Sequence, residues 1–158
     1  MLKLSSFFAI IAGAILVLGG LWGINFTYQN ISRENIITTP DSALPNKPVR
    51  DPLTLKAQAD VIRKHVLEMT NGKTYSQMPR QIAKVDENGS PILDENGKPV
   101  MVENSTRNLW VTATTLTTAL NLGILTYAFS AFTILMGIIS IWTGVVFFAL
   151  SKNTKSSR

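Results

Sequence analysis

Residues 109–150 read LWVTATTLTTALNLGILTYAFSAFTILMGIISIWTGVVFFAL, a run of 42 residues without Asp, Glu, Lys, Arg or His. About 20 apolar residues span the hydrocarbon core of a bilayer, where charged side chains are costly. As one helix the run would be about 63 Å long, roughly twice the thickness of that core. Its first part, 109–122, is rich in threonine, so we expect it to stand outside the membrane. The sequence therefore predicts one long helix over 109–150 that spans the membrane from about residue 123.

A second uncharged run, 4–24, follows Lys3. Two interpretations are open, a cleaved signal peptide or a retained anchor. A signal peptide has an apolar core of about 7–15 residues and a small-residue cleavage site. This run has 21 residues and ends in LWGINF, without an Ala-x-Ala site. We therefore favour a transmembrane helix within 1–28, with Trp22, Phe26 and Tyr28 at the membrane–water boundary, where aromatic residues gather.

Basic residues flank both apolar runs, with Lys3 before the first and the tail 151–158 after the second. Lysine and arginine are enriched on the cytoplasmic side of membrane helices. The segment between the runs is longer than the roughly 60 residues within which loop charges bias orientation. We expect both termini in the cytoplasm and the segment 29–108 outside, in a plasma membrane crossed twice.

The segment 29–108 divides into three parts. Residues 29–50 contain three prolines and predict an extended linker. Residues 53–70 place Leu55, Ala59, Ile62, Val66 and Met69 at helical spacing, which predicts an amphipathic helix. Residues 85–100 read VDENGSPI and then LDENGKPV, and each Asn-Gly predicts a hairpin turn. The fold class is thus mainly α: a two-helix transmembrane hairpin with an external cap of one amphipathic helix and a small β-meander of three strands.

Little in the chain favours catalysis or metal binding. There is no cysteine, and His65 is the one histidine, so the usual zinc and non-haem iron sets cannot form. The repeat offers Asp86 and Asp94 to calcium, but it lacks the further ligands of an EF-hand loop, and plain turns are the favoured interpretation. The net charge is +5, yet residues 26–108 carry eleven basic and ten acidic residues, so nucleic-acid binding is not expected. We predict no catalytic, cofactor-binding or metal-binding residue.

Several blocks resemble a family of small double-pass membrane proteins common in actinobacteria. They are Glu34-Asn35-Ile36, Thr39-Pro40-Asp41, Asp51-Pro52-Leu53-Thr54, Ala57-Gln58-Ala59-Asp60-Val61-Ile62, His65, Leu67-Glu68, Gly72-Lys73-Thr74-Tyr75, the Arg107 region and both apolar runs. Family members often carry the label of an aromatic ring-opening dioxygenase, but these residues offer no iron site. The resemblance implies the double-pass architecture and a bacterial cytoplasmic membrane. The repeat at 85–100 looks like an insertion relative to the family.

Small residues recur along both apolar runs at alternating spacings of three and four. The predicted packing seam consists of Gly13, Gly20, Gly23, Gly123, Thr126, Ser130, Thr133, Gly137, Ser140 and Gly144. Small residues let helix backbones approach closely in lipid. The seam could join the two helices of one chain, or face a copy of the chain or another membrane protein.

The functional hypothesis is a non-catalytic accessory or structural subunit. It would lie in the lipid bilayer and bind another membrane protein, or itself, through its helices and external cap. Two alternatives stay open: an extracytoplasmic ligand or ion sensor, which the acidic repeat suggests, and an enzyme, which only the family label suggests.

Overall fold

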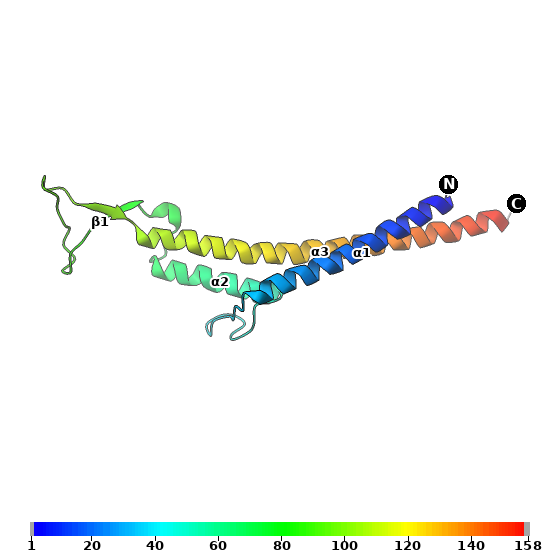
Figure 1. The fold of residues 1–158 in the computed structure, drawn as a ribbon, viewed down its shortest axis with the longest axis horizontal. Coiled ribbons are helices and arrows are strands. Elements are labelled where there is room, and N and C mark those ends of the chain that lie inside the picture. Colours follow the sequence, from blue (N-terminus) through cyan, green and yellow to red (C-terminus); the bar gives the residue numbers. More distant parts are fainter. Residues whose placement is uncertain (1, 157–158) are drawn as a thin grey trace.

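The protein is mainly helical, and its longest helix is the element on which the others pack. The computed structural model describes residues 2–156, with three α-helices over that range: α1 (Leu2–Arg33), α2 (Pro52–Met69) and α3 (Ser105–Ser156). Figure 1 shows α1 along one half of α3, α2 along the other half, and both ends of the chain at the same end of the molecule. Ser157 and Arg158 of the predicted basic tail lie outside the described residues.

Both long helices exceed their predicted bounds. Helix α1 continues past residue 28 to Arg33 and stops before Asn35, which has a positive φ of 50°. Helix α3 begins at Ser105, because Asn104 caps it: the side-chain Oδ1 of Asn104 accepts the backbone N–H of Arg107 at 3.2 Å. The uncharged runs cover only part of each helix, and polar residues extend both helices beyond them.

The amphipathic helix is present as α2. Asp51 caps it, accepting the backbone N–H groups of Leu53 and Thr54, and Pro52 occupies its first turn. Leu55 and Ala59 are buried beside Leu120, and Val66 is buried beside Trp110. Met69 is 62% exposed, so its predicted place on the buried face is wrong, because it is the last helical residue.

The predicted extended linker is instead a folded loop. Ile37 and Pro48 form an antiparallel bridge, and Thr38 is 1% exposed. The backbone N–H of Lys47 donates to Thr38 Oγ1 at 2.9 Å, and the N–H of Thr38 donates to the Lys47 carbonyl at 2.9 Å. The prolines prevent a helix in this segment, but the hydrogen bonds between the buried Thr38 and Lys47 fold it into a closed loop.

The predicted three-stranded meander is wrong over the described residues. They hold a two-stranded antiparallel sheet, β1 (Gln81–Ala83) with β2 (Met101–Glu103), preceded by a short 3₁₀ turn, η1 (Tyr75–Gln77). The two repeats form single bridges at Pro91 and Pro99. Proline lacks the N–H that a ladder needs, so pairing does not extend there.

The predicted turns are present at both Asn-Gly pairs, where the backbone N–H of Gly89 donates to the Asp86 carbonyl and that of Gly97 donates to the Asp94 carbonyl, each at 3.0 Å. Only the glycines take a positive φ, 81° at Gly89 and 75° at Gly97, whereas the preceding asparagines do not. Asp86 Oδ1 accepts the backbone N–H groups of Asn88 (2.9 Å) and Ser90 (2.8 Å). The aspartate, rather than a left-handed asparagine, therefore fixes each turn.

Candidate functional site: a small-residue helix seam

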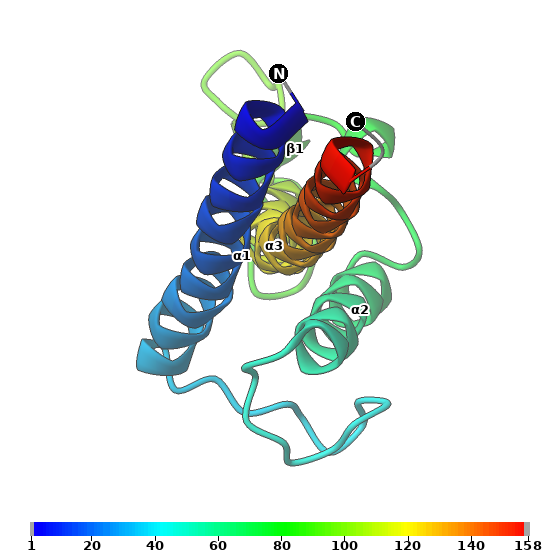
Figure 2. The same ribbon diagram turned by 90° about the vertical axis from the view of Figure 1, so that its right-hand side faces the viewer.

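Helices α1 and α3 pack backbone against backbone at a pair of glycines, Gly13 and Gly137. A Cβ placed on Gly13 would lie 2.6 Å from the Gly137 carbonyl oxygen, and one on Gly137 would lie 2.7 Å from the Gly13 carbonyl oxygen. Real Cβ atoms do not come so close to backbone, so neither position accepts a side chain without movement. Figure 2 shows the two helices crossing where they meet.

Two interhelical hydrogen bonds lie on the same seam. Ser6 Oγ donates to the Gly144 carbonyl at 2.7 Å, and Ser140 Oγ donates to the Ala9 carbonyl at 2.8 Å. Ser6 is fully buried. A serine hydroxyl between apolar helices needs such a partner, so these bonds fix the antiparallel register of α1 on α3.

The seam continues through Ser130. A Cβ on Gly20 would lie 2.8 Å from the Ser130 carbonyl oxygen, and one on Gly23 would lie 2.6 Å from Ser130 Oγ. The structure thus brings together Gly13, Gly20 and Gly23 of α1 with Ser130, Gly137, Ser140 and Gly144 of α3.

Three predicted members lie elsewhere. Thr126 is exposed and Thr133 is half-buried, and their hydroxyls donate to Leu122 and Phe129 carbonyls of their own helix. Gly123 contacts Ile31 of α1 and Leu55 of α2, at the junction of the three helices.

A seven-residue repeat describes the buried positions better than alternating spacings. Besides Ala113, which packs beside Val66 of α2, the buried small residues are Ser6, Gly13, Gly20 and Thr27 in α1, and Ser130, Gly137, Gly144 and Ser151 in α3. Thr27 and Ser151 were missed by the sequence reasoning, although the strict period of seven in both helices could have identified them.

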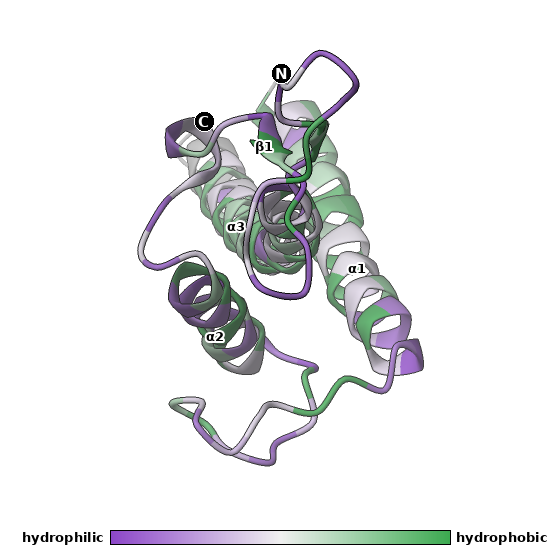
Figure 3. Cartoon of the chain, turned by 90° about the vertical axis from the view of Figure 1, so that its left-hand side faces the viewer, coloured by the Kyte–Doolittle hydropathy of each residue, from purple (hydrophilic) through white to green (hydrophobic). Residues whose placement is uncertain are grey.

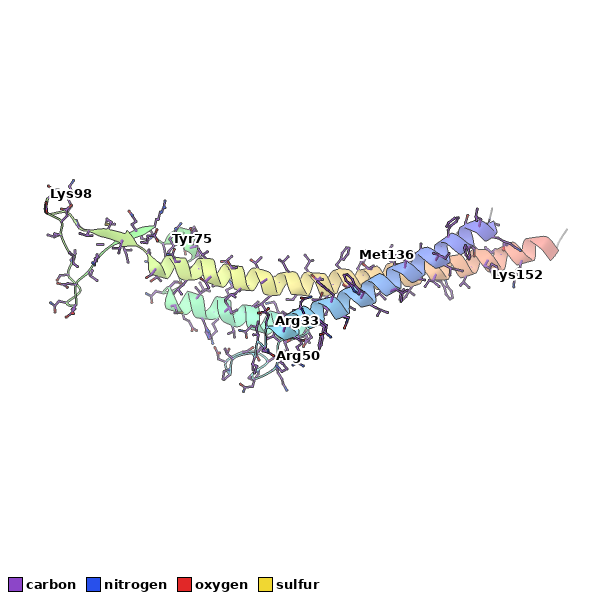
Figure 4. The ribbon with its side chains drawn as sticks, viewed as in Figure 1. Arg33, Arg50, Tyr75, Lys98, Met136 and Lys152 are labelled. Carbon is purple, nitrogen blue, oxygen red and sulfur yellow. The ribbon has the colours of Figure 1, made fainter. Side chains whose placement is uncertain are left out.

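Polar contacts lie where the seam ends, near the C-terminal end of α1. Tyr127 Oη donates to the Arg50 carbonyl at 2.6 Å, and Arg50 Nη1 donates to Tyr28 Oη at 3.5 Å. These bonds join α3, the loop before α2 and α1 at one level. Figure 4 places Arg33 and Arg50 there, at the end of α1.

Asp41 attaches the folded loop to α2. Its carboxylate accepts hydrogen bonds from Thr39 Oγ1 (2.8 Å) and Lys64 Nζ (3.1 Å) and is 2.8 Å from His65 Nε2. The bonds from Thr39, His65 and Lys64, in that order, hold the pKa of Asp41 below its usual range. The same contact raises the pKa of Lys64. This cluster is surface-exposed and joins the folded loop to α2.

The described residues contain no group of three or more His, Cys, Asp or Glu side chains placed to hold a metal ion. Asp86 and Asp94 each use one carboxylate oxygen to accept two backbone N–H groups. The repeat therefore uses these acidic groups to build its turns.

Comparison with protein-family models, with curated proteins and with solved structures gives no match. The functional proposal therefore rests on the seam and on the segments that pack around it.

Proposed function

We propose that this protein is a non-catalytic membrane protein that crosses a bacterial cytoplasmic membrane twice and serves as an accessory or structural subunit. The observation that carries the proposal is the inverted distribution of side chains in the α1–α3 pair. Glycine and serine lie at the closest backbone contacts between the helices, with aliphatic side chains such as Val17 and Ile134 packed on them. The largest apolar residues face outward: Leu18, Trp22 and Phe129 are each 67% exposed, and Trp142 is 71% exposed.

Water would penalise that arrangement, because burying apolar side chains is the main source of stability in a soluble fold. Both helices are long and apolar enough to span a membrane, and only 11% of each apolar window is buried. The core helix of a soluble protein is mostly buried. In lipid, by contrast, outward Leu, Phe and Trp are favourable and close packing of small residues holds helices together. Figure 3 shows the hydrophobic colouring of α1 and α3 beside the mixed colouring of α2.

The helices that pack on α3 support a position for the bilayer along it. Helix α2 carries Lys56, Asp60 and Arg63 beside the outer part of α3, and such charges belong in water. Helix α1 covers the rest of α3, from Gly123 onward. The outward aromatic residues Trp22 and Phe26, whose ring centroids are 5.2 Å apart, fit the outer boundary. This supports a span from about residue 123 and an external place for 109–122.

The termini lie together at the other end of the hairpin (Figure 1), where Lys3 and Lys152 are found. Positive charge at that end supports a cytoplasmic location for both termini. The external cap then consists of the folded loop, α2, the small sheet and the outer half of α3.

The subunit role rests on what this architecture presents to a partner. It offers a closely packed helix hairpin and a cap whose described polar contacts hold its own segments together. An ion sensor would depend on acidic groups such as Asp86 and Asp94, but these carboxylates already accept backbone N–H groups in the turns of the repeat. Purification from native membranes in a gentle detergent tests the role. A co-purifying protein in a fixed ratio, or a stable oligomer of the chain, supports it. A monomer that retains a small ligand or metal through purification overturns it in favour of a sensor.

A further inference from the structure

Three Asn-Gly pairs occur in the chain: Asn71-Gly72, Asn88-Gly89 and Asn96-Gly97. In such a pair the backbone nitrogen of the glycine can attack the side-chain amide carbon of the asparagine, because glycine has no Cβ to crowd the attacking atom. All three glycines have a positive φ, and all six residues are exposed. Sequence and exposure leave the three pairs equivalent, so only their surroundings can give them different reactivity.

Two of the pairs lie in the segment 84–100, which connects β1 to β2 and which we call the arm. The arm extends past the start of α3 (Figure 1), and Figure 4 places Lys98 at its far end. No residue of the arm is buried, and its apolar side chains Val85 and Leu93 are 54% and 57% exposed. Opening the arm therefore exposes little additional apolar surface, and segments of this kind open at low free energy.

The reactive groups in the arm are held by few contacts. One backbone hydrogen bond of 3.0 Å, to the carbonyl of Asp86 or Asp94, engages the nitrogen of each glycine. Among residues 2–156, the side-chain amides of Asn88 and Asn96 have no hydrogen-bond partner. Opening a single turn therefore frees both the attacking nitrogen and the amide carbon.

The pair Asn71-Gly72 lies instead in a turn anchored at the end of α2. The backbone N–H of Gly72 donates to the Leu67 carbonyl at 2.7 Å. Thr70 is 3% exposed, and its hydroxyl lies 2.6 Å from the Lys73 carbonyl oxygen, which also accepts the Trp110 Nε1–H at 2.8 Å. Freeing the Gly72 nitrogen disrupts these contacts around a buried threonine, so this turn opens less often than the arm.

We propose that Asn88 and Asn96 are sites of spontaneous deamidation and that the turn after α2 protects Asn71. When the arm opens, the Gly89 nitrogen loses its proton and bonds to the side-chain amide carbon of Asn88. The bond from that carbon to the amide nitrogen breaks, and ammonia leaves. Water then opens the succinimide ring at either carbonyl, which gives aspartate or isoaspartate. The steps need water and no oxidant or reductant, and they do not depend on the proposed subunit role.

Deamidation would change the arm in two ways. The arm contains two basic and four acidic residues, so two conversions take its formal charge from −2 to −4. Isoaspartate also moves the side-chain methylene into the main chain between residues 88 and 89. Asp86 Oδ1 accepts the N–H groups of both Asn88 and Ser90, and the longer main chain alters the separation of these two groups. The modified arm is therefore more acidic and has a weaker turn.

Mass spectrometry that resolves the three sites tests the proposal on the full chain. The protein in detergent is kept warm at neutral pH, and tandem mass spectrometry of its peptides follows the conversion of each asparagine. Local opening free energies range from near zero in loops to that of global unfolding, so we expect Asn88 and Asn96 to react about tenfold or more faster than Asn71. In guanidinium chloride the three sites should react at similar rates, because no turn then protects Asn71. Equal rates at the three sites of the folded protein, or no reaction in the arm, would overturn the proposal.

Two variants test the chemistry and the protection separately. Asn88→Gln lengthens the side chain and removes the favourable five-membered ring, so reaction at residue 88 should stop while Asn96 keeps its wild-type rate. Thr70→Val keeps the size of the side chain but removes the hydroxyl, so Asn71 should react faster while the arm is unchanged. An unchanged rate at Asn71, or equal acceleration of the arm, would contradict the protective turn.

Discussion

The packing of the seam predicts different effects for alanine substitution of two glycines in α1, Gly13 and Gly19. Gly13 lies against α3, where an added Cβ would be 2.6 Å from the Gly137 carbonyl oxygen and 2.8 Å from the backbone nitrogen of Ile141. Gly19 has nothing within 4 Å of the same added atom. Gly13→Ala and Gly19→Ala therefore make the same chemical change in opposite surroundings.

The magnitude follows from two opposing effects. Alanine is favoured over glycine inside a helix by about 1 kcal/mol, and both variants gain this equally. Only Gly13→Ala must also separate two backbones, and overpacking of this kind costs about 1–3 kcal/mol. We expect Gly19→Ala to be neutral or stabilising. We expect Gly13→Ala to be less stable than Gly19→Ala by about 1–3 kcal/mol, the overpacking cost alone.

Energy transfer between dyes at Lys3→Cys and Lys152→Cys reports the separation of α1 from α3, because both labels lie at the same end of the hairpin (Figure 1). The free energy of unfolding comes from titration of the folded protein with sodium dodecyl sulfate in mixed micelles. A lower transition midpoint for Gly13→Ala than for Gly19→Ala is the predicted result. Equal midpoints would refute the close packing of α1 on α3.

Three further outcomes follow from individual contacts. Ser6→Ala removes the hydrogen bond to the Gly144 carbonyl and should cost about 0.6–1.7 kcal/mol in the same titration, whereas a midpoint equal to wild type would show that this bond adds nothing. The lowered pKa of Asp41 means that the carboxylate's contribution to loop stability is fully present above the unfolded value of 3.8 and is lost progressively as pH falls from there through the lower folded value. Hydrogen exchange of the loop amides 34–50 should thus be faster for Asp41→Asn than for wild type at pH 7, with a smaller difference at pH 3, and equal rates at pH 7 would show that Asp41 does not hold the loop. Calorimetry of the full chain in detergent should detect no saturable calcium binding at micromolar concentration, and binding abolished by Asp86→Ala would contradict the turn role of that carboxylate.

The apolar runs predicted the two long helices because charge is excluded from a bilayer over a known length. Their ends were less predictable, since they depend on single caps and turns such as Asn104 and Asn35. The segment 29–50 was predicted as an extended linker because its prolines exclude a helix. Its closure depends on the burial of Thr38, which no local pattern encodes.

The seam was visible in sequence as recurring small residues, yet its register was not. Alternating spacings of three and four include both Thr126, which is exposed, and Gly137, which is buried. Only the crossing of α1 over α3 separates the small residues that lie in the contact, such as Gly137, from those that do not, such as Thr126. The covering of Ala113 by α2 likewise depends on tertiary packing between segments far apart in the chain.

The proposed topology is a membrane hairpin with an external cap and cytoplasmic termini. Cysteines that replace Lys56, which lies on α2, and Lys152, near the end of α3, are each probed on intact cells with a membrane-impermeant thiol reagent. This topology predicts labelling at Lys56→Cys in intact cells and labelling at Lys152→Cys only after the membrane is broken. Labelling at Lys152→Cys but not at Lys56→Cys in intact cells would contradict it.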